Sequence, residues 1–369
     1  MIDWQRIWDD DGNTSGYGPV KIIARILSFF YLGVINFRNW LYDHKIFKED
    51  RLACPVISVG NITVGGTGKT PCVIMLARML QKNGFKPAVI SRGYGGSSVS
   101  RYNVVSDGDK ILLDSATAGD EPLLMAHALK GIPVITGAKR IIPGRAAIDK
   151  FGANVLICDD AMQHRQIFRD INLILMDGKS LQGKNYILPR GRFREPLQEI
   201  RRADAILMTR FEEGTKTDEK IRMLIAAEKI PVFRSIHQPQ DIIRGDYSES
   251  QPASGLKGKK VFAFCGIANP DSFEKTLLAV QASLLSFKIF ADHHRFGEKE
   301  VEELKAGFIK SGADYLVTTE KDAMRLQGYP EFLKELFVLR VEMEIKPDAR
   351  SFEDFIIKNL KLCQGKEKG

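Results

Sequence analysis

A glycine-rich loop between an apolar run and a helical pattern constrains this chain more than any other feature. Residues 55–59 read as a buried strand, and a helix pattern begins at Lys69. Glycines between them let backbone N–H groups approach phosphate oxygens, and the helix N-terminus adds free donors and partial positive charge. The segment predicts a nucleotide-phosphate cradle, a P-loop, formed by Gly65, Gly66, Thr67, Gly68, Lys69 and Thr70.

The loop departs from the generic P-loop pattern at one position. In that pattern Lys69 reaches the outer phosphates and the Thr70 hydroxyl takes a place on Mg²⁺. The usual first glycine, five residues before the glycine of the Gly-Lys-Thr triplet, is replaced by Thr63. Gly65 and Gly66 supply the flexibility instead. The alternative is a glycine-rich turn in an ordinary strand-to-helix unit.

Composition narrows the class of protein. The length of 369 residues suits two domains, and 44% hydrophobic with 27% charged residues is typical of a globular protein. A net charge of +8 suits anionic partners such as phosphates or an acidic membrane surface. A basic and aromatic run that would bind single strands is missing from the sequence, so we expect no nucleic-acid partner. Five widely spaced cysteines without a CxxC argue against disulfides and zinc and for a reducing compartment.

Residues 19–41 predict an apolar helix near the N-terminus. The preceding residues 1–18 carry four aspartates and lack the basic region of a secretory signal. Arg25 and Asn36 interrupt the apolar run, which is shorter than the ~20 residues that span a bilayer. Lys21 and Arg38 could extend to lipid headgroups, and Trp40 favours the interface. A helix lying in the membrane interface and a buried core helix both explain this pattern.

The rest of the chain alternates strand-like and helical patterns. Nearly continuous apolar runs predict strands covered on both faces, and alternation with helices predicts parallel βαβ units in a three-layer α/β domain. The expected strands lie near 55–59, 87–91, 133–136, 154–158, 171–176 and 204–209, and the helices near 69–83, 120–130 and 142–151.

Polar residues with proline and glycine over 236–259 interrupt this alternation and predict a linker or exposed excursion. A second α/β series follows, with strands near 260–265, 286–290, 314–318 and 337–343 and helices near 270–282, 298–311 and 350–361. We therefore expect an N-terminal helix over 1–45, a P-loop domain over 46–245 and a smaller α/β domain over 246–369.

Carboxylates follow two of the expected strands. Ligands of an open parallel sheet gather at the carboxyl ends of its strands. Asp159 and Asp160 end strand 154–158 and are placed to hold Mg²⁺, directly or through water. The alternative is a helix N-cap aspartate and a turn aspartate. Asp177 after strand 171–176 competes for the metal and ranks lower, because Asp-Gly is a common turn pair.

Two further segments carry candidate acid–base groups. Asp120 precedes an apolar helix pattern, and an N-cap role is at least as good a prediction as proton acceptor. His293 and His294 follow strand 286–290 beside Asp292 and suit acid–base work or a polar loop. They are not a metal pair, because adjacent side chains in an extended segment point to opposite faces.

Arginines concentrate over residues 188–202. Their guanidinium forks suit an anionic substrate or acidic lipid, and a solvated basic loop is the alternative. Glu195 lies among them and suits an ion-pair partner or an additional ligand of hydrated Mg²⁺.

Taken together, these segments resemble the tetraacyldisaccharide 4'-kinase, or lipid A 4'-kinase, family. The resemblance covers residues about 20 to 345 in order and spacing, and the Thr63 variant fits the family. It rests on the segments Gly60–Pro71, Ser91–Gly95, Gly119–Pro122, Asp159–Asp160 with Gln163 and His164, Arg194–Pro196, Cys265–Pro270, Asp292–Phe296 and Thr319–Asp322.

The resemblance implies a definite activity. The family transfers the γ-phosphoryl group of ATP to the 4'-hydroxyl of a lipid-linked, acylated glucosamine disaccharide 1-phosphate in lipid A biosynthesis. It works at the cytoplasmic face of the bacterial inner membrane with an N-terminal hydrophobic helix as anchor, which favours the interface alternative for residues 19–41. We expect ATP and Mg²⁺ as cofactors and no obligate protein partner.

The resemblance also implies residue roles. Lys69 and Thr70 fall on the phosphate-binding lysine and the hydroxyl beside Mg²⁺. Asp120 falls on the proposed catalytic base with His293 as its dyad partner, which reverses the preference for a cap. The metal-site acids are Asp159, Asp160 and Glu195, with Gln163 in the same element. A dyad of Asp120 and His293, on opposite sides of the expected linker, predicts a cleft between the domains.

Two points remain open at the level of sequence. Ala161 and Met162 stand where the family usually has glycine and an apolar residue, which predicts a restricted turn after Asp160. The rival functions are a P-loop ATPase or GTPase switch of the partitioning or metal-delivery type and a non-enzymatic nucleotide-binding module at a membrane.

Overall fold

The computed structural model describes residues 7–8, 18–97, 100–178, 185–210 and 219–366. The chain forms two compact units, and both are discontinuous in sequence. Unit 1 comprises residues 1–91, 139–236 and 345–369, and unit 2 comprises 92–138 and 237–344. Unit 1 contains α2 (Gly18–Asp43), β1 (Val56–Asn61), α3 (Lys69–Lys82), β2 (Pro87–Ser91), α6 (Ile141–Phe151), β5 (Val155–Asp159), β6 (Ile171–Asp177), the 3₁₀ helix η1 (Leu197–Arg202), β7 (Ala205–Thr209), α7 (Glu219–Ala227), the start of β8 (Val232–Arg244) and α12 (Ala349–Lys366).

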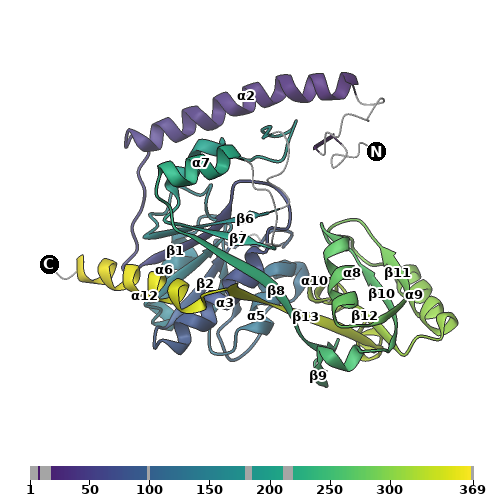
Figure 1. Cartoon of the computed structure of the whole chain (residues 1–369). Coiled ribbons are helices and arrows are strands. Elements are labelled where there is room, and N and C mark those ends of the chain that lie inside the picture. The colour runs from purple at the N-terminus through teal and green to yellow at the C-terminus, as the bar shows by residue number, and fades with distance from the viewer. Residues whose placement is uncertain (1–6, 9–17, 98–99, 179–184, 211–218, 367–369) are drawn as a thin grey trace. The chain divides into compact units, whose positions relative to one another are not determined.

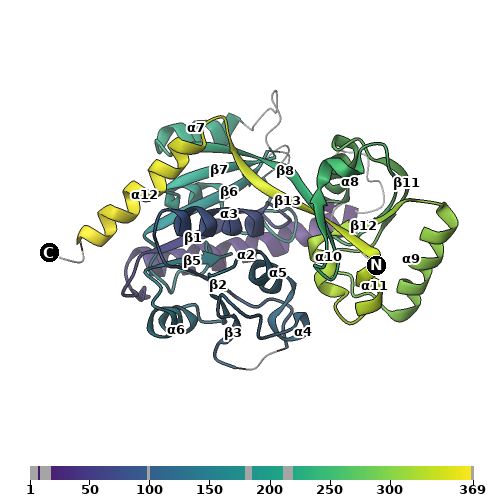
Figure 2. The same ribbon diagram turned by 90° about the horizontal axis from the view of Figure 1, so that it is seen from below.

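Unit 1 is a three-layer α/β fold, as the sequence predicts. Its strands follow the order β8-β7-β6-β1-β5-β2, and each neighbouring pair in this series is parallel. Helix α7 covers one face of this sheet with α2 beyond it (Figure 1), and α3 covers the opposite face (Figure 2). Every residue of β1 is buried, because helices cover both faces.

Helix α3 shows how the pattern produces this packing. Its buried residues Cys72, Val73, Leu76, Ala77 and Leu80 recur at helical spacing and form one face toward β1, β2 and β5. The helix begins directly after the glycine-rich loop. Packing of this face therefore fixes the position of Lys69 and Thr70 relative to the strand ends.

Unit 2 is built on a second parallel series. It contains β3 (Asn103–Ser106), α4 (Ser115–Ala118), α5 (Asp120–Ala128), β4 (Val134–Thr136), the end of β8, β9 (Ser250–Pro252), η2 (Ala253–Leu256), β10 (Lys260–Cys265), α8 (Pro270–Ala279), β11 (Ser283–Ile289), α9 (Glu298–Ser311), β12 (Tyr315–Thr319), α10 (Glu320–Arg325), α11 (Pro330–Glu335) and most of β13 (Leu336–Lys346). The order is β11-β10-β12-β13-β8, with β9 antiparallel to β8 and β3 antiparallel to β4.

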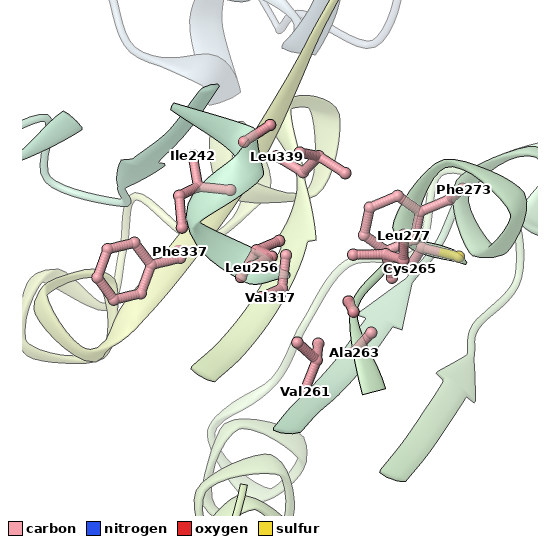
Figure 3. Packing of buried hydrophobic residues seen from close by; sticks show 12 residues of the cluster. Ile242, Leu256, Val261, Ala263, Cys265, Phe273, Leu277, Val317, Phe337 and Leu339 are labelled. Atoms are coloured by element: carbon pink, nitrogen blue, oxygen red, sulfur yellow. The ribbon is translucent and has the colours of Figure 1, made fainter. Parts of the chain in front are cut away.

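Strand β10 lies at the centre of the unit 2 core. Val261, Ala263 and Cys265 point to one face, where they meet Phe273 and Leu277 of α8 (Figure 3). The alternate residues Phe262 and Phe264 enter a second cluster on the other face, with Phe296, Leu304 and Phe332. Alternation along one strand thus fills two apolar layers.

The two units differ from the domains expected from the sequence. Residues 92–138 were expected in the P-loop domain and belong to unit 2, and the C-terminal helix α12 belongs to unit 1. Local patterns cannot reveal this, because the assignment depends on long-range packing: α10 and α5 contact closely, and Phe352 of α12 packs edge-on against Phe233 of β8.

The expectation of a linker or exposed excursion over 236–259 is wrong for most of this range, although the turn over 245–249 agrees with it. Strand β8 runs without interruption from Val232 to Arg244, followed by β9 and η2. The polar side chains of β8 do not follow an apolar strand pattern, because they pair with the neighbouring strand β13. Asp241 accepts from Arg340 at 2.7 Å, and Gln240 donates to Glu342 at 2.8 Å.

The expected N-terminal helix is confirmed as α2. Within the described residues, α2 is the helix whose length and apolar composition meet the requirement for crossing a membrane, a test that buried helices also pass. Little of α2 is buried, with Ala24, Ile35 and Asn39 as its buried residues. A long apolar face therefore lies open on this helix: Ile22, Ile23, Ile26, Leu27, Phe29, Phe30, Val34, Phe37 and Trp40 are each 46–73% exposed.

Candidate functional site

The glycine-rich loop of unit 1 joins the end of β1 to the start of α3. Gly65 and Gly68 have φ angles of 113° and 86°, a left-handed region that disfavours any side chain with a Cβ. Gly68 is the N-cap of α3 and offers no side chain to its first amides. The first N–H groups of α3 are thus available to an anion at the helix N-terminus.

Thr63 occupies an extended position, where the generic loop pattern has glycine. It is buried and pairs as an isolated antiparallel bridge with Phe193. The Val64 N–H donates to the Arg192 carbonyl at 2.8 Å, and the Arg194 N–H donates to the Ile62 carbonyl at 2.8 Å. A β-branched residue suits such extended pairing, so threonine needs no glycine-like conformation here.

Lys69 and Asp160 meet beside the loop. The Lys69 Nζ lies 3.5 Å from Asp160 Oδ1 and donates to Asn61 Oδ1 at 3.3 Å. Arg194 donates to both Asp160 oxygens at 2.9 and 3.0 Å. Burial opposes ionisation of Asp160, but the charges of Lys69 and Arg194 outweigh it and hold the pKa of this carboxyl below its usual value.

Side chains with hydroxyl or carboxylate oxygens also occur at the ends of β2 and β5 and at the start of α3. Asp159 ends β5 and is 2% exposed, and the Ser91 hydroxyl donates to its Oδ2 at 3.3 Å. The Thr70 hydroxyl lies in the first turn of α3 and is also buried. The left-handed conformation of this turn falls on Asp160, with φ of 48°, and not on Ala161, and aspartate tolerates it better than most residues.

Asp120 and His293 meet within unit 2. Gly119 is the N-cap of α5 and Asp120 is its first residue, so the N-cap alternative for Asp120 is wrong. The Nδ1 of His293 lies 3.7 Å from Asp120 Oδ2. Arg325 of α10 donates through Nε to the same Asp120 oxygen at 2.6 Å. His294, by contrast, contacts Glu300 at 2.9 Å and stacks on Phe290.

The contacts of Asp120 and His293 shift both pKa values. Burial opposes ionisation of Asp120, but the nearby His293 ring, 3.7 Å away, and the hydrogen bond from Arg325 outweigh it and lower the pKa of this carboxyl. The Asp120 carboxylate raises the pKa of His293 above its ordinary value, against the effect of burial. The pair is therefore stabilised as carboxylate and imidazolium.

Comparison with known families now adds to this geometry. Residues 20–361 match the model of the family described as Tetraacyldisaccharide-1-P 4'-kinase. The chain belongs to this family. The match includes the glycine-rich loop of unit 1 and the Asp120–His293 pair of unit 2, and it confirms the resemblance seen in the sequence.

Individual members of this kinase family match over nearly their full length. The Tetraacyldisaccharide 4'-kinase of Syntrophus aciditrophicus is 40% identical over 97% of this chain and 98% of its own. That of Geobacter metallireducens is 38% identical over 92% and 98%. The crystal structure of "apo" form LpxK from Aquifex aeolicus in complex with ATP superposes with a TM-score of 0.76, at 32% identity, over 92% of this chain and 99% of that one.

Glu195, expected among the metal ligands of this kinase, is bound by arginines. Its side chain is 0% exposed, Oε1 accepts from Arg38 of α2 at 2.9 Å, and Oε2 accepts from Arg202 of η1. Both oxygens are thus taken by cations. The structure contradicts the metal assignment and supports the ion-pair alternative, because long-range packing brings α2 onto a carboxylate 157 residues away.

The arginines over 188–202 also bind mainly within the protein. Arg190 is buried and donates to the Ile7 carbonyl at 2.8 Å, while Arg202 pairs with Glu195 and Glu199. Arg201 is 53% exposed and lies 3.5 Å from Asp43. The solvated-loop alternative is wrong for Arg190 and Arg202, because Arg190 is buried against a backbone carbonyl and Arg202 pairs with two carboxylates in the interior.

Some contacts of the site lie outside the sequence predictions. Asn61 ends β1 and bridges Lys69 and Thr67, while Thr209 ends β7 and donates to the Thr67 carbonyl at 3.0 Å. The strand-end rule could have found both. Arg325 is different, because nothing local to α10 indicates that it reaches Asp120, 205 residues away.

The structure also places Asp177 and the glycine segment after β2, two segments that the sequence singled out. Asp177 is buried and lies 3.4 Å from Arg210, so a cation within the protein faces it. In unit 2 the glycine segment after β2 borders a cavity, and Tyr94 beside it is 77% exposed. The cavity lining includes Arg92, Gly93, Tyr94, Gly95, Asn103 and Thr136.

Proposed function

We propose that this protein transfers the γ-phosphoryl group of ATP to the 4'-hydroxyl of a tetraacylated glucosamine disaccharide 1-phosphate, a step of lipid A biosynthesis. The observation that carries the proposal is the family match over residues 20–361, which includes both the glycine-rich loop and the Asp120–His293 pair. The ATP in the solved family structure from Aquifex aeolicus supports the same donor.

The nucleotide site is assigned to the glycine-rich loop and the start of α3. Backbone N–H groups of Gly65, Gly66 and Gly68 would cradle the phosphates, and Lys69 would carry positive charge to the outer ones. The Thr67 N–H donates to the Gly65 carbonyl at 3.0 Å and would have to turn from it to join them. Support comes from the left-handed glycines and from Lys69, which is held by Asn61 and Asp160. ATP entering this site would provide Lys69 with phosphate oxygens in addition to Asp160.

Mg²⁺ fits the donors beside this loop. Thr70, Asp159 and Asp160 offer hydroxyl and carboxylate oxygens, the ligands that Mg²⁺ prefers. The part of the chain that the structure describes holds no cluster of three or more His, Cys, Asp or Glu side chains. Mg²⁺ usually keeps several waters and takes phosphate oxygens from its substrate. Glu195 does not fit, because Arg38 and Arg202 hold its carboxylate. Bound Mg²⁺ would neutralise charge on the transferring phosphoryl group.

Asp120 is the proposed proton acceptor, with His293 as its partner. The sugar 4'-oxygen forms a bond to the γ-phosphorus while the bond to the β–γ bridging oxygen breaks, and ADP leaves. The hydroxyl proton passes to the Asp120 carboxylate, whose lowered pKa keeps it ionised and ready to accept. His293 lies 3.7 Å from that carboxylate, which raises the pKa of the ring, and the ring adds to the stabilisation of the carboxylate when it is protonated.

A membrane role is proposed for α2. Its open apolar face includes Phe29, Phe30 and Phe37, and Trp40 stacks on Phe37 near the end of the helix. A lipid acceptor requires access to a membrane, so we assign this face to the interface of the cytoplasmic leaflet of the bacterial inner membrane. The net charge of +8 favours anionic lipid there.

Transfer of label from γ-labelled ATP to the disaccharide 1-phosphate lipid tests the proposal directly. We expect labelled lipid product that depends on the acceptor and on Mg²⁺. Lys69→Ala and Asp120→Ala should each lower turnover by about 10²-fold or more with the fold retained by circular dichroism. Hydrolysis of ATP that ignores the acceptor would instead support an ATPase switch. Full activity in Asp120→Ala would remove Asp120 as the base.

A further inference from the structure

Arg325 connects the two proposed acid–base groups within unit 2. Its side chain is 4% exposed, and each of its three nitrogens has a partner. Nε donates to Asp120 Oδ2 at 2.6 Å, and Nη2 lies 3.3 Å from His293 Nδ1. Nη1 donates to the Gly266 carbonyl at 2.8 Å and to Asp322 Oδ1 at 3.1 Å. One planar guanidinium therefore sets the relative position of a carboxylate and an imidazole.

The Arg325 guanidinium is itself held in place by the buried, hydrogen-bonded carboxylate of Asp322. Asp322 is 0% exposed, and its two oxygens each accept the Gly266 N–H at 3.1 Å. The Thr319 hydroxyl donates to Asp322 Oδ2 at 2.6 Å. Burial of Asp322 requires such compensation, because an unpaired interior charge is costly. Asp322 therefore anchors Arg325 through Nη1, while Nε of the same guanidinium reaches Asp120.

The contact between Arg325 and His293 specifies a tautomer. A guanidinium has donors and no acceptor, so Nδ1 of neutral His293 must accept and the ring proton lies on Nε2. Asp120 Oδ2 lies farther from Nδ1, at 3.7 Å. A proton gained at Nδ1 turns this nitrogen from an acceptor of Arg325 into a donor toward Asp120. Arg325 and Asp120 thus compete for one ring nitrogen.

We propose that Arg325 is a positioning residue of the phosphoryl transfer: it holds Asp120 through Oδ2, leaves Oδ1 to face the acceptor hydroxyl, and keeps Nδ1 of neutral His293 as an acceptor. The inference rests on the proposed function of Asp120 and His293. A merely structural tie between α10 and α5 does not require Arg325, because Lys321 of α10 also pairs with Glu121 of α5.

Steady-state kinetics of Arg325→Gln and Arg325→Lys test this role. Arg340→Gln is the control, since Arg340 also pairs with an aspartate of unit 2, Asp241, at 2.7 Å and does not contact Asp120, although its side chain is more exposed than that of Arg325. We expect Arg325→Gln to lower kcat by about 10–100-fold with little change in the KM for ATP, with partial recovery in Arg325→Lys. The acid limb of the pH profile should move to higher pH, because Arg325 lowers the pKa of Asp120.

A purely structural role predicts a different result. Arg325→Gln would then match Arg340→Gln, with activity reduced only in proportion to the folded fraction and an unshifted pH profile. That result would overturn the proposal. If Arg325→Gln does not fold, Arg325→Lys serves as the test, because lysine keeps the positive charge. An unshifted pH profile and an unchanged kcat in folded Arg325→Lys would also overturn the proposal.

The ring tautomer gives a readout independent of activity. In the full chain labelled with ¹⁵N-histidine, His293 is assigned by comparison with His293→Gln, and its ring shifts are followed at pH above its titration. We expect the Nε2–H form in the wild type and a gain of Nδ1–H in Arg325→Gln. An Nδ1–H ring in the wild type would contradict the assignment. Absence of lipid phosphorylation by the wild type would instead refute the proposed function, and the tautomer result would stand apart from it.

Discussion

At the scale of residues, the surroundings of each carboxylate decide its role. Asp160 and Glu195 are both acidic residues of unit 1, and both are bound by arginine. Asp160 is partly open, with its side chain 36% exposed, whereas Glu195 is 0% exposed and held from two sides. We therefore propose Asp160 as a metal ligand that exchanges its cation partners, whereas Glu195 cannot leave its arginines without leaving buried charges unpaired.

Matched substitutions separate these two carboxylates. Glu195→Gln should lower the free energy of unfolding by about 3–5 kcal/mol, because Arg38 and Arg202 lose a buried partner. Asp160→Asn should cost less than about 1 kcal/mol, since the pair is partly exposed and asparagine tolerates the left-handed backbone. Asp160→Asn should raise the Mg²⁺ concentration needed for turnover. Urea unfolding and Mg²⁺ titrations measure both. Unchanged stability with a raised Mg²⁺ requirement in Glu195→Gln would make Glu195 a metal ligand.

The Asp120–His293 pair predicts a pH-dependent contribution to stability. The pKa of His293 is raised in the folded state, so its stabilisation is complete below the unfolded value of about 6.5 and is lost as pH rises through the folded pKa. The pKa of Asp120 is lowered, so its contribution is lost only in acid. The stability difference between wild type and His293→Gln should therefore shrink above neutral pH.

Urea unfolding of the wild type and of His293→Gln at several pH values measures this difference in the free energy of unfolding. The Asp120→Asn background is the control, because a neutral side chain there removes the partner that raises the His293 pKa. The pH-dependent difference should be much smaller in that background. An equal difference in both backgrounds would show that His293 interacts with another group.

At the scale of elements, helix α2 combines a fixed side with an open side. Its Tyr31 hydroxyl donates to the Arg194 carbonyl at 3.1 Å, and Arg38 pairs with Glu195. These contacts attach the helix to the segment that also pairs with the glycine-rich loop. Burial raises the pKa of Tyr31, in keeping with a hydroxyl that stays protonated and donates. The apolar face is left for another environment.

Three substitutions on that face test membrane binding. Ile26, Phe30 and Phe37 lie four and seven residues apart on one side of α2 and are 55%, 66% and 62% exposed. Changing all three to serine should weaken association with anionic vesicles by at least about 10-fold, because each loses apolar area that would enter the interface. Vesicle sedimentation measures this. The matched control changes Leu278, Leu285 and Ile309, exposed apolar residues of unit 2, to serine. Equal loss in both variants would contradict a specific role of α2.

At the scale of the whole molecule, the chain crosses between its compact units several times. Strand β8 begins in unit 1 and ends in unit 2, and β13 leads from unit 2 back toward unit 1. As a result, Asp120 and His293 belong to one unit although the sequence separates them by 173 positions (293 minus 120). The expectation that this dyad spans two domains is wrong, because residues 92–138 pack with 237–344.

The C-terminal helix α12 belongs to unit 1, and we expect its packing to contribute to the stability of that unit. Phe352 of α12 is 1% exposed and packs edge-on against Phe233 with ring centroids 5.0 Å apart. Phe352→Ala should lower the free energy of unfolding of unit 1 by about 3–5 kcal/mol, the usual cost of removing a buried aromatic ring. Leu362→Ala on the same helix is the control, since Leu362 is 55% exposed and should change stability by less than about 0.5 kcal/mol.

Nucleotide binding during unfolding identifies which unit responds. Loss of ATP binding should occur at lower urea in Phe352→Ala, because the loop that would hold ATP lies in unit 1. An unchanged midpoint for ATP binding would mean that α12 contributes little to this unit.

The sequence by itself determined what depends on neighbouring residues. Glycine spacing, apolar alternation and strand-end acids predicted a phosphate cradle, the parallel α/β elements and the candidates Lys69, Asp159 and Asp160. These signals are local, since backbone conformation and side-chain direction follow from residues a few positions apart. The order of the family's segments added the likeness to a kinase. The preference for Asp120 as a base with His293 came from the family resemblance.

Tertiary structure alone decided how charges are paired and where the chain divides. Glu195 lies among arginines from α2 and η1, Arg325 lies between Asp120 and His293, and β8 replaces an expected linker. Each outcome depends on groups far apart in sequence. The partner of a charged side chain is set only when packing brings the two groups together and excludes water from them. The glycine-rich loop illustrates both kinds of information. Its sequence predicts a phosphate cradle, whereas only the structure explains Thr63, which pairs in an extended conformation with Phe193.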